Sequence, residues 1–517
     1  MYADHRVPGR LGHHYRHRDR YGGQLHRLGS GDFHGEHPGG NCPGAGDHVP
    51  DEQFDREPGN GCLHGTGVAG DTVTVFEGGQ ALCSAVVDST NKWTCTPTAG
   101  LSAGSHTVVA TQTDTAGKTS GPSNTVTFTI TIVGTQFVPK SPYRVLDTRP
   151  DTKVGSTTGP VALGGSVTLS AAQLKVPAGT ASAVVINLTF DAPAEAGFVT
   201  AYPSDQPRPV VSSLNFAKGQ TRANLVIVPM AADGSITLYA QQQTQLVADV
   251  FGYFATQALT DSGLFHPLTP SRLLDTRVGN NTPLGTNETR NLAVTGTGGV
   301  PASGVEAVVL NVTVSRPTGA GYVSAFPKGA AFDNMTSNVN FQPGDLASTR
   351  VIVPVGTDGS VSFYNFNGST PLVVDVTGWF SATGSQDTTG AQFVAVDPAR
   401  VIDSRFPSVG TTGGALGAGE TRPLQLTGGA NVPTAGTVAV VSNLTAVNPT
   451  VDGFFTQFPT GTARPLASDV NFVANEVVAN LTLGGVSAAG QASVYNLAGS
   501  TDVLEDVSGY FRVLPAG

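Results

Sequence analysis

Three copies of one arginine–aspartate hexapeptide are the residues in this chain whose types and spacing could do chemistry. They occupy residues 144–149, 272–277 and 400–405, so their first arginines recur at a constant interval of 128 residues (272 − 144 and 400 − 272). Arginine and carboxylate side chains form rigid bidentate pairs, and both types also bind hydroxyl-rich ligands. A fixed interval of this size, with sequence likeness along its length, predicts one folding unit copied three times.

Each copy also ends on an aspartate, within an Asp-Val-x-Gly-aromatic-Phe stretch. If the first and last strands of a copy are neighbours, this aspartate can pair with the hexapeptide arginines and pin the two ends of the domain together. A repeated sugar or anion site is the alternative. A catalytic carboxylate pair fits poorly because no nucleophile or base partner accompanies it. The network considered for either role comprises Arg144, Asp147, Arg149, Asp249, Arg272, Asp275, Arg277, Asp375, Arg400, Asp403, Arg405 and Asp506.

The stretches that must position these residues are typical of short β-strands joined by Gly- and Pro-containing turns. On the order of eight to ten strands in each copy predict a β-sandwich or jelly-roll-like domain. The predicted domains span residues 136–255, 264–381 and 392–512. The short polar connectors between them predict independent domains on flexible linkers, and a closed three-fold arrangement is the alternative.

Two further features recur once in every copy. An Asn-x-Thr triplet begins at Asn187, Asn311 and Asn443, inside the most apolar strand, which favours a buried amide bonded to neighbouring backbone over a glycosylation site. A Gly-aromatic pair supplies Phe198, Tyr322 and Phe454. These rings are expected in the core, with a carbohydrate platform as the alternative.

Residues 66–132 form a different pattern of short alternating strands at sandwich spacing. Cys83 and Cys95 flank the turn at residues 88–91, and two strands joined by a short turn would place them nearly opposite each other. The sequence therefore predicts a disulfide and an oxidising, extracellular compartment, with two buried thiols as the alternative. Together with residues 70–75, 104–108 and 123–128, the hairpin at Trp93 resembles the bacterial Ig-like domains of secreted and surface proteins.

Residues 1–65 differ in composition from the rest of the chain. They contain nine of its eleven histidines but few apolar residues, and disorder is the expectation. The histidines show no repeated ligand spacing, and Cys42 and Cys62 form no CxxC-like pair, so no metal site is predicted. The richness in Arg, His, Gly and Pro suggests a GC-rich gene read out of frame. No signal peptide is recognisable at the start of the sequence.

The three long copies resemble a tandem module of proteins secreted by actinomycete-type bacteria, found alone, beside Ig-like domains or appended to secreted hydrolases. The R-x-x-D-T/S-R opening and the D-V-x-G-aromatic-F close carry this resemblance. It implies an extracellular or cell-surface location and no particular activity.

Composition and motifs exclude several function classes. With a net charge of −10 and only 13% charged residues, the chain has no basic patch for nucleic acid, and no apolar run is long enough to span a membrane. No catalytic motif occurs, so we expect neither an enzyme nor a cofactor nor a metal.

The overall prediction is an all-β, secreted bacterial protein: a disordered N-terminal segment, an Ig-like sandwich and three homologous repeats. Its expected role is that of a spacer, adhesion or carbohydrate-binding module. Cell-wall polysaccharide or peptidoglycan is the expected partner, and the oligomeric state is left open. One alternative is an appendage of a secreted hydrolase whose catalytic domain is missing upstream, and another is a phage-like assembly protein.

Overall fold

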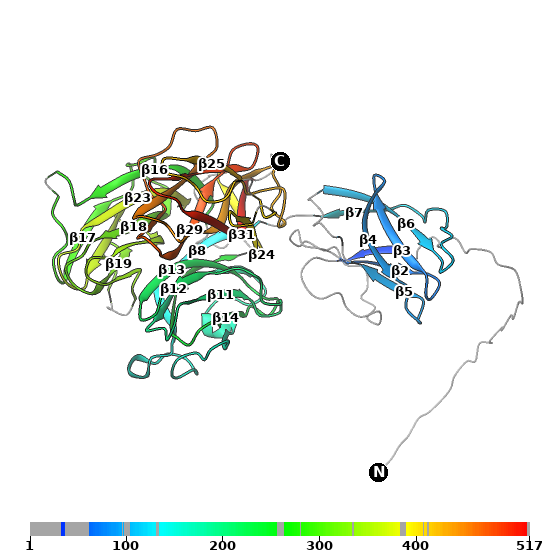
Figure 1. Ribbon diagram of the computed structural model, residues 1–517, viewed down its shortest axis with the longest axis horizontal. Helices are drawn as coiled ribbons and strands as arrows, with labels where there is room; N and C mark the ends of the chain where they lie inside the picture. Colours follow the sequence, from blue (N-terminus) through cyan, green and yellow to red (C-terminus); the bar gives the residue numbers. More distant parts are fainter. Residues whose placement is uncertain are drawn as a thin grey trace, which may run out of the picture. The chain divides into compact units, whose positions relative to one another are not determined.

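The computed structural model describes residues 33–36 and 62–513, apart from gaps at 96, 98–103, 131–133, 256–262, 280, 333–335, 383–388, 407 and 411–412. Almost all regular structure in this part of the chain is β, as predicted, with one short helix, α1 (Ala171–Leu174), and one 3-10 turn, η1 (Pro150–Thr152). The chain divides into two compact units (Figure 1). The first includes Leu63–Cys95 and Thr107–Thr127, and the second includes Phe128–Gly517.

The first unit is a small two-sheet sandwich. One sheet has the order β4-β3-β6-β7 and the other β1-β2-β5. Its strands are β1 (Phe33–Glu36), β2 (Cys62–Thr66), β3 (Thr72–Glu77), β4 (Gln80–Val86), β5 (Lys92–Cys95), β6 (Gly104–Thr113) and β7 (Val126–Ile130). The predicted disorder of residues 1–65 lies largely outside the described residues. Within that segment β1 and β2 are strands, and β2 pairs with β5, so the unit gains a strand that the sequence pattern lacked.

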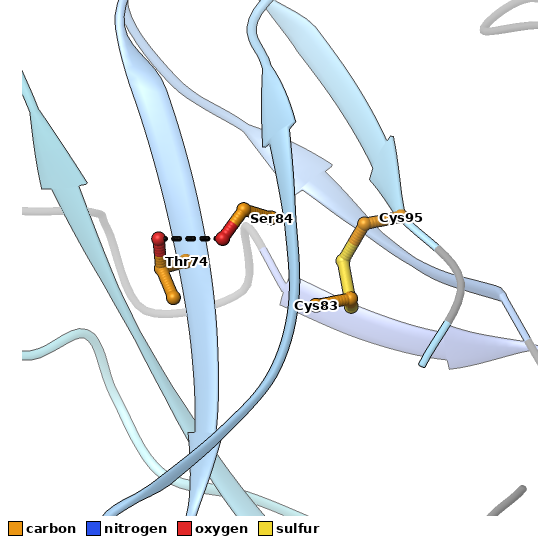
Figure 2. Close-up of a disulfide and its surroundings, with 4 residues drawn as sticks. All are labelled: Thr74, Cys83, Ser84 and Cys95. Carbon is orange, nitrogen blue, oxygen red and sulfur yellow. Dashed lines mark hydrogen bonds between the residues drawn. A yellow bond between two sulfur atoms is a disulfide. The ribbon is translucent and has the colours of Figure 1, made fainter. Parts of the chain in front are cut away.

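The predicted disulfide between Cys83 and Cys95 is present, but its geometry differs from the expected one. Cys83 lies on β4 and Cys95 on β5, and these strands belong to different sheets (Figure 2). The turn between them carries the chain from one sheet to the other, so the disulfide crosses the interior of the sandwich. Both cysteines are buried, with 7% and 5% of their surface exposed. On the other side of β4, the Thr74 and Ser84 hydroxyls form a 2.8 Å hydrogen bond with β3.

In the second unit, each repeat is a sandwich of two four-stranded antiparallel sheets, here called inner and outer. The inner sheets have the orders β13-β10-β15-β8, β21-β18-β23-β16 and β29-β26-β31-β24, and the outer sheets β12-β11-β14-β9, β20-β19-β22-β17 and β28-β27-β30-β25. The same strand order in all three repeats agrees with a copied folding unit.

The strand bounds follow the chain in register. In the first repeat they are β8 (Gln136–Asp147), β9 (Ser166–Leu169), β10 (Ala181–Asp191), β11 (Gly197–Pro203), β12 (Leu214–Phe216), β13 (Thr221–Pro229), β14 (Ile236–Ala240) and β15 (Gln245–Ala255). In the second they are β16 (Phe265–Asp275), β17 (Glu288–Ala293), β18 (Val305–Ser315), β19 (Gly321–Pro327), β20 (Val339–Phe341), β21 (Leu346–Pro354), β22 (Ser360–Asn365) and β23 (Leu372–Ser381). In the third they are β24 (Ala391–Asp403), β25 (Thr421–Gln425), β26 (Thr437–Val447), β27 (Gly453–Pro459), β28 (Val470–Phe472), β29 (Val477–Gly485), β30 (Gln491–Asn496) and β31 (Asp502–Val513).

The inner sheets are apolar on both faces. On β10, Val184 and Ile186 point into the core of the first repeat, whereas Ala183 and Val185 join a second cluster shared by all three repeats. Strands buried on both faces read as continuous apolar runs, which is why this stretch does not alternate with polar residues. Each repeat therefore has its own core and also contributes to a common one, the shared centre.

Six phenylalanines, two from each repeat, form the middle of the shared centre. Within each repeat the two rings lie 5.2–5.4 Å apart. Between repeats each ring of one pair contacts the next pair in a cycle: Phe137 with Phe380 at 4.5 Å, Phe265 with Phe511 at 4.2 Å, and Phe393 with Phe254 at 4.2 Å. All six side chains are at most 1% exposed.

Backbone pairing follows the same cycle. Phe137 pairs with Gly263, Phe265 with Ala391 and Phe393 with Thr135, so each phenylalanine meets the residue two places before its counterpart in another repeat. The interpretation as independent domains on flexible linkers is therefore wrong. The repeats close into one pseudo-three-fold unit because the solvent-side face of each inner sheet is too apolar to remain exposed.

Candidate functional site: three arginine–aspartate clamps

The first clamp joins the first and last strands of repeat 1. Arg144 on β8 is in register with Asp249 on β15, because these strands pair antiparallel at the edge of the inner sheet. The guanidinium donates from Nε to Asp249 Oδ1 at 2.8 Å and from NH2 to Oδ2 at 3.2 Å. This bidentate geometry fixes both strands in one register.

Asp147 is a second carboxylate in the same clamp, and it is saturated by donors from its own chain segment. Arg144 NH1 donates to Oδ2 at 3.1 Å, and Arg149 donates from Nε and NH2 at 3.0 and 2.8 Å. The Arg149 backbone N–H and the Thr152 hydroxyl add bonds of 3.1 and 2.8 Å. The alternation of arginine and aspartate along the hexapeptide therefore builds one connected network.

The structure brings the other candidate residues together in the same way. Arg272 holds Asp375 at 2.8 and 3.1 Å, and Arg400 holds Asp506 at 2.7 and 2.9 Å. Asp275 accepts from Arg277, and Asp403 accepts from Arg405. Asp506 also accepts from the backbone N–H of Ser212 at 3.1 Å, so the third clamp contacts the first repeat.

The two carboxylates of a clamp have pKa values shifted in opposite directions. Hydrogen bonds from Arg277 lower the pKa of Asp275 to about 2. Burial raises the pKa of Asp249, Asp375 and Asp506 against the opposing effect of their arginines. Every one of these six carboxylates accepts from an arginine of its own repeat.

The three Asn-x-Thr asparagines are buried and link neighbouring repeats. The Nδ2 group of Asn187 donates to the carbonyl of Ser337 at 2.6 Å, that of Asn311 to Ser468 at 2.5 Å, and that of Asn443 to Ser212 at 2.6 Å. A buried amide bonded to backbone was predicted. Its partner lies in a different repeat, which the one-dimensional pattern could not indicate.

Arg350 and Asp469 form a buried ion pair that sequence reasoning missed. Arg350 on β21 is 1% exposed and donates to Asp469, before β28 of the third repeat, at 2.6 Å. Strand register aligns Arg350 with Leu225 and Leu481, because each lies opposite the Asn-x-Thr asparagine. A comparison of the three copies with one another would have revealed this charge at a leucine position.

A polar cluster inside the third repeat was also missed. Glu505 is completely buried, and its carboxylate accepts from Gln457 Nε2 at 2.5 Å and from the Ser442 hydroxyl at 3.2 Å. Burial raises the pKa of Glu505 to about 8. The corresponding residues in the first repeat are Ala248, Ala201 and Ile186, all members of its apolar core.

Arg222 ties the three repeats together near their common axis. Its guanidinium lies 3.1 Å from Glu476 of the third repeat and 3.8 Å from Asp345 of the second. It also lines a small pocket to which all three repeats contribute, with Asn215, Asn340 and Val478 among its lining residues. The pocket is flanked by paired charges and lies far along the chain from any clamp aspartate.

The core expectation for Phe198, Tyr322 and Phe454 is wrong. These rings belong to none of the apolar clusters and lie half-buried on the outward face of the outer sheets. Their neighbours Val199, Val323 and Phe455 point into the cores instead. The strand period of two accounts for the difference, because only one of two successive residues can face the core.

Among the described residues no group of three or more His, Cys, Asp or Glu side chains is arranged to hold a metal ion. No helix in the described part of the chain has the length and apolar character needed to cross a membrane.

Comparison with known proteins defines the first unit. Residues 60–131 match the family model of a bacterial Ig-like domain, in agreement with the resemblance expected from the sequence. A search of curated proteins finds no match to the chain.

Among solved structures, a triple jelly-roll turret protein of an archaeal virus aligns with 9% identity, covering 72% of this chain and 91% of that one, at a TM-score of 0.16. A tetra-tandem repeat from the extending region of a large adhesion protein aligns with 13% identity, covering 87% and 92%, at a TM-score of 0.12. Likenesses at such TM-scores carry no argument about fold or function.

Proposed function

We propose that this chain is a non-catalytic, secreted or surface-attached bacterial protein whose three-repeat unit is a rigid head for adhesion to carbohydrate or cell-wall polymer. The observation that carries the proposal is the closed ring of three sandwiches around one phenylalanine centre. Closure holds three outer sheets in fixed relative directions, so weak contacts on each could add without the entropy cost of flexible linkers.

In this proposal the arginine–aspartate clamps are structural. Their carboxylates already accept bidentate and backbone hydrogen bonds, and Asp249 and Asp375 are fully buried. A ligand would have to displace an internal arginine to reach them. The clamps then serve to hold the first and last strand of each repeat together, and no acid–base or nucleophilic role is assigned to them.

The extracellular location rests on the first unit. Its match to a bacterial Ig-like domain and its buried Cys83–Cys95 disulfide both favour an oxidising environment. A disulfide of this kind is rarely maintained in a reducing cytosol.

Sedimentation of the full chain with purified peptidoglycan and with insoluble neutral glycans tests the proposal. Saturable co-sedimentation with at least one polymer is expected, and a reduced sample controls for the Ig-like unit. Absence of saturable binding to every polymer would reject the adhesion role and leave a spacer. Hydrolysis of any of these polymers would contradict the non-catalytic assignment.

A further inference from the structure

The outward face of the outer sheet differs between the three repeats at five equivalent positions. In the second repeat all five are aromatic, and we call them the aromatic strip: Tyr322, Phe326, Phe332, Tyr364 and Phe366. The first repeat has Phe198, Tyr202, Arg208, Tyr239 and Gln241 there, and the third has Phe454, Phe458, Arg464, Tyr495 and Leu497. Strand register and shared backbone hydrogen bonds establish this equivalence.

The rings of the aromatic strip form a continuous row. Tyr322 and Phe366 are stacked at 4.9 Å and 12°, and Phe326 and Phe332 are stacked at 4.7 Å and 7°. Tyr364 connects the two pairs, because its ring lies 6.3 Å from Tyr322 and 4.8 Å from Phe332. Phe366 is 46% exposed, and the other four rings are half-buried.

Charge distinguishes this face from its two counterparts. In the first and third repeats an arginine lies over the equivalent tyrosine, with Arg208 at 4.2 Å from the Tyr239 ring and Arg464 at 3.8 Å from Tyr495. Phe332 replaces that arginine in the second repeat. At the end of the row, Lys328 and Asp358 pair with each other and so neutralise their charges. An uncharged aromatic surface is complementary to a neutral ligand.

Hydrogen-bonding side chains border the aromatic strip along the edge strand β17. Thr289 is in register with Tyr364, and Asn291 is in register with Ser362, so both lie on the same face as the rings. Both are exposed, and Asn291 Oδ1 accepts from the Ser362 hydroxyl at 2.7 Å. Flat apolar rings beside hydroxyl and amide groups match a pyranose, which has an apolar C–H face and a polar rim.

We propose that the aromatic strip binds a neutral glycan chain by stacking sugar rings on its aromatic side chains, with Thr289 and Asn291 bonding their hydroxyls. This inference rests on the proposed function and locates it on one of the three repeats. The first and third repeats do not share the site, because an arginine already covers their tyrosine.

Affinity electrophoresis and calorimetry of the full chain test this inference, with soluble β-glucan, mannan and chitohexaose as probes. The informative variant is Phe332→Arg with Phe366→Gln, which installs the residues that the first repeat holds at these positions and so preserves the fold. At least a tenfold loss of affinity is expected. Arg464→Phe in the third repeat is the matched control and should leave affinity unchanged or raise it.

The outcomes separate this inference from the proposed function. Glycan binding by wild type that survives both substitutions would place the site elsewhere, so the inference fails while the adhesion role stands. Loss of self-association or of protein binding in the variant, without any glycan binding by wild type, would identify the strip as a protein interface and overturn the inference. No binding of wild type to any polymer, soluble or insoluble, would overturn both.

Discussion

The shared centre and the three separate cores use similar residues but obey the repeat to different degrees. The separate cores of the first and second repeats are apolar throughout, whereas the third contains Glu505 and Gln457. The shared centre has cyclic phenylalanine contacts but also one buried ion pair, Arg350–Asp469, that only a contact between the second and third repeats could accommodate. Duplication thus supplied the symmetric framework, and later substitutions diversified the buried positions where two copies meet.

The largest effect is expected from removing one partner of the ion pair in the shared centre. Asp469→Ala leaves the buried Arg350 without a carboxylate and should lower the free energy of unfolding by about 3–5 kcal/mol. The double variant Arg350→Leu with Asp469→Ser installs the residues of the first repeat, Leu225 and Ser213, and should recover most of this loss. Denaturant unfolding measures both, and a loss below about 1 kcal/mol for Asp469→Ala would contradict the argument.

A large-to-small substitution distinguishes the shared centre from a separate core. Phe254→Ala and Phe216→Ala should each cost about 3–5 kcal/mol, because both rings are at most 3% exposed. Hydrogen exchange should show lost protection in the inner sheets of all three repeats for Phe254→Ala. For Phe216→Ala the loss should concentrate in the first repeat. Equal patterns for the two variants would mean that the shared centre does not couple the repeats.

The inter-repeat asparagines allow a finer comparison. Asn187→Ala removes one hydrogen bond, to Ser337, and should cost about 1–2 kcal/mol. Asn311 makes the equivalent bond and also accepts from Asn480 Nδ2 at 2.8 Å, so Asn311→Ala should cost about 1 kcal/mol more. Parallel urea titrations decide the order, and the reverse order would argue against these bonds as repeat-to-repeat links.

Glu505 makes the stability of the third repeat depend on pH with the smallest expected slope. Its pKa is about 8 when folded and near the ordinary value of 4.5 when unfolded, so the folded state binds more protons between these values. Stability should therefore fall as pH rises from about 4.5 to about 8, by at most about 1.4 kcal/mol per pH unit.

The Glu505→Gln variant should lose this slope in chemical denaturation at several pH values. Asp275 acts in the opposite sense, because its pKa of about 2 means that its stabilising contribution disappears only below about pH 4. A stability that rose between pH 5 and 8 in wild type, with no change in the variant, would exclude the buried carboxylate as its cause.

Much of the fold was predictable because it follows from local pattern. The alternating stretches predicted the strands, the recurring hexapeptide predicted the repeat, and the spacing of Cys83 and Cys95 predicted the disulfide. The pairing of Arg144 with Asp249 follows from adjacent first and last strands. These inferences depend on residues near one another in sequence or related by the repeat period.

What could not be predicted depends on contacts between copies. The ring closure was missed because the polar connectors were interpreted as free linkers, although the run from Ala183 to Ile186 is apolar at successive positions. A strand with two apolar faces needs a cover on each side, and this was the available signal. The aromatic strip and Arg350 become visible only when the three copies are aligned against one another.

The cyclic backbone pairing also determines where the chain enters and leaves the three-repeat unit. Thr135, at its start, pairs with Phe393, and Val513, at the end of β31, pairs with Ala391 two residues away. Entry and exit therefore lie on the same strand. A mechanical load transmitted along the polypeptide would pass through β24 and its immediate neighbours, and most of the unit would hang beside the line of tension without bearing it.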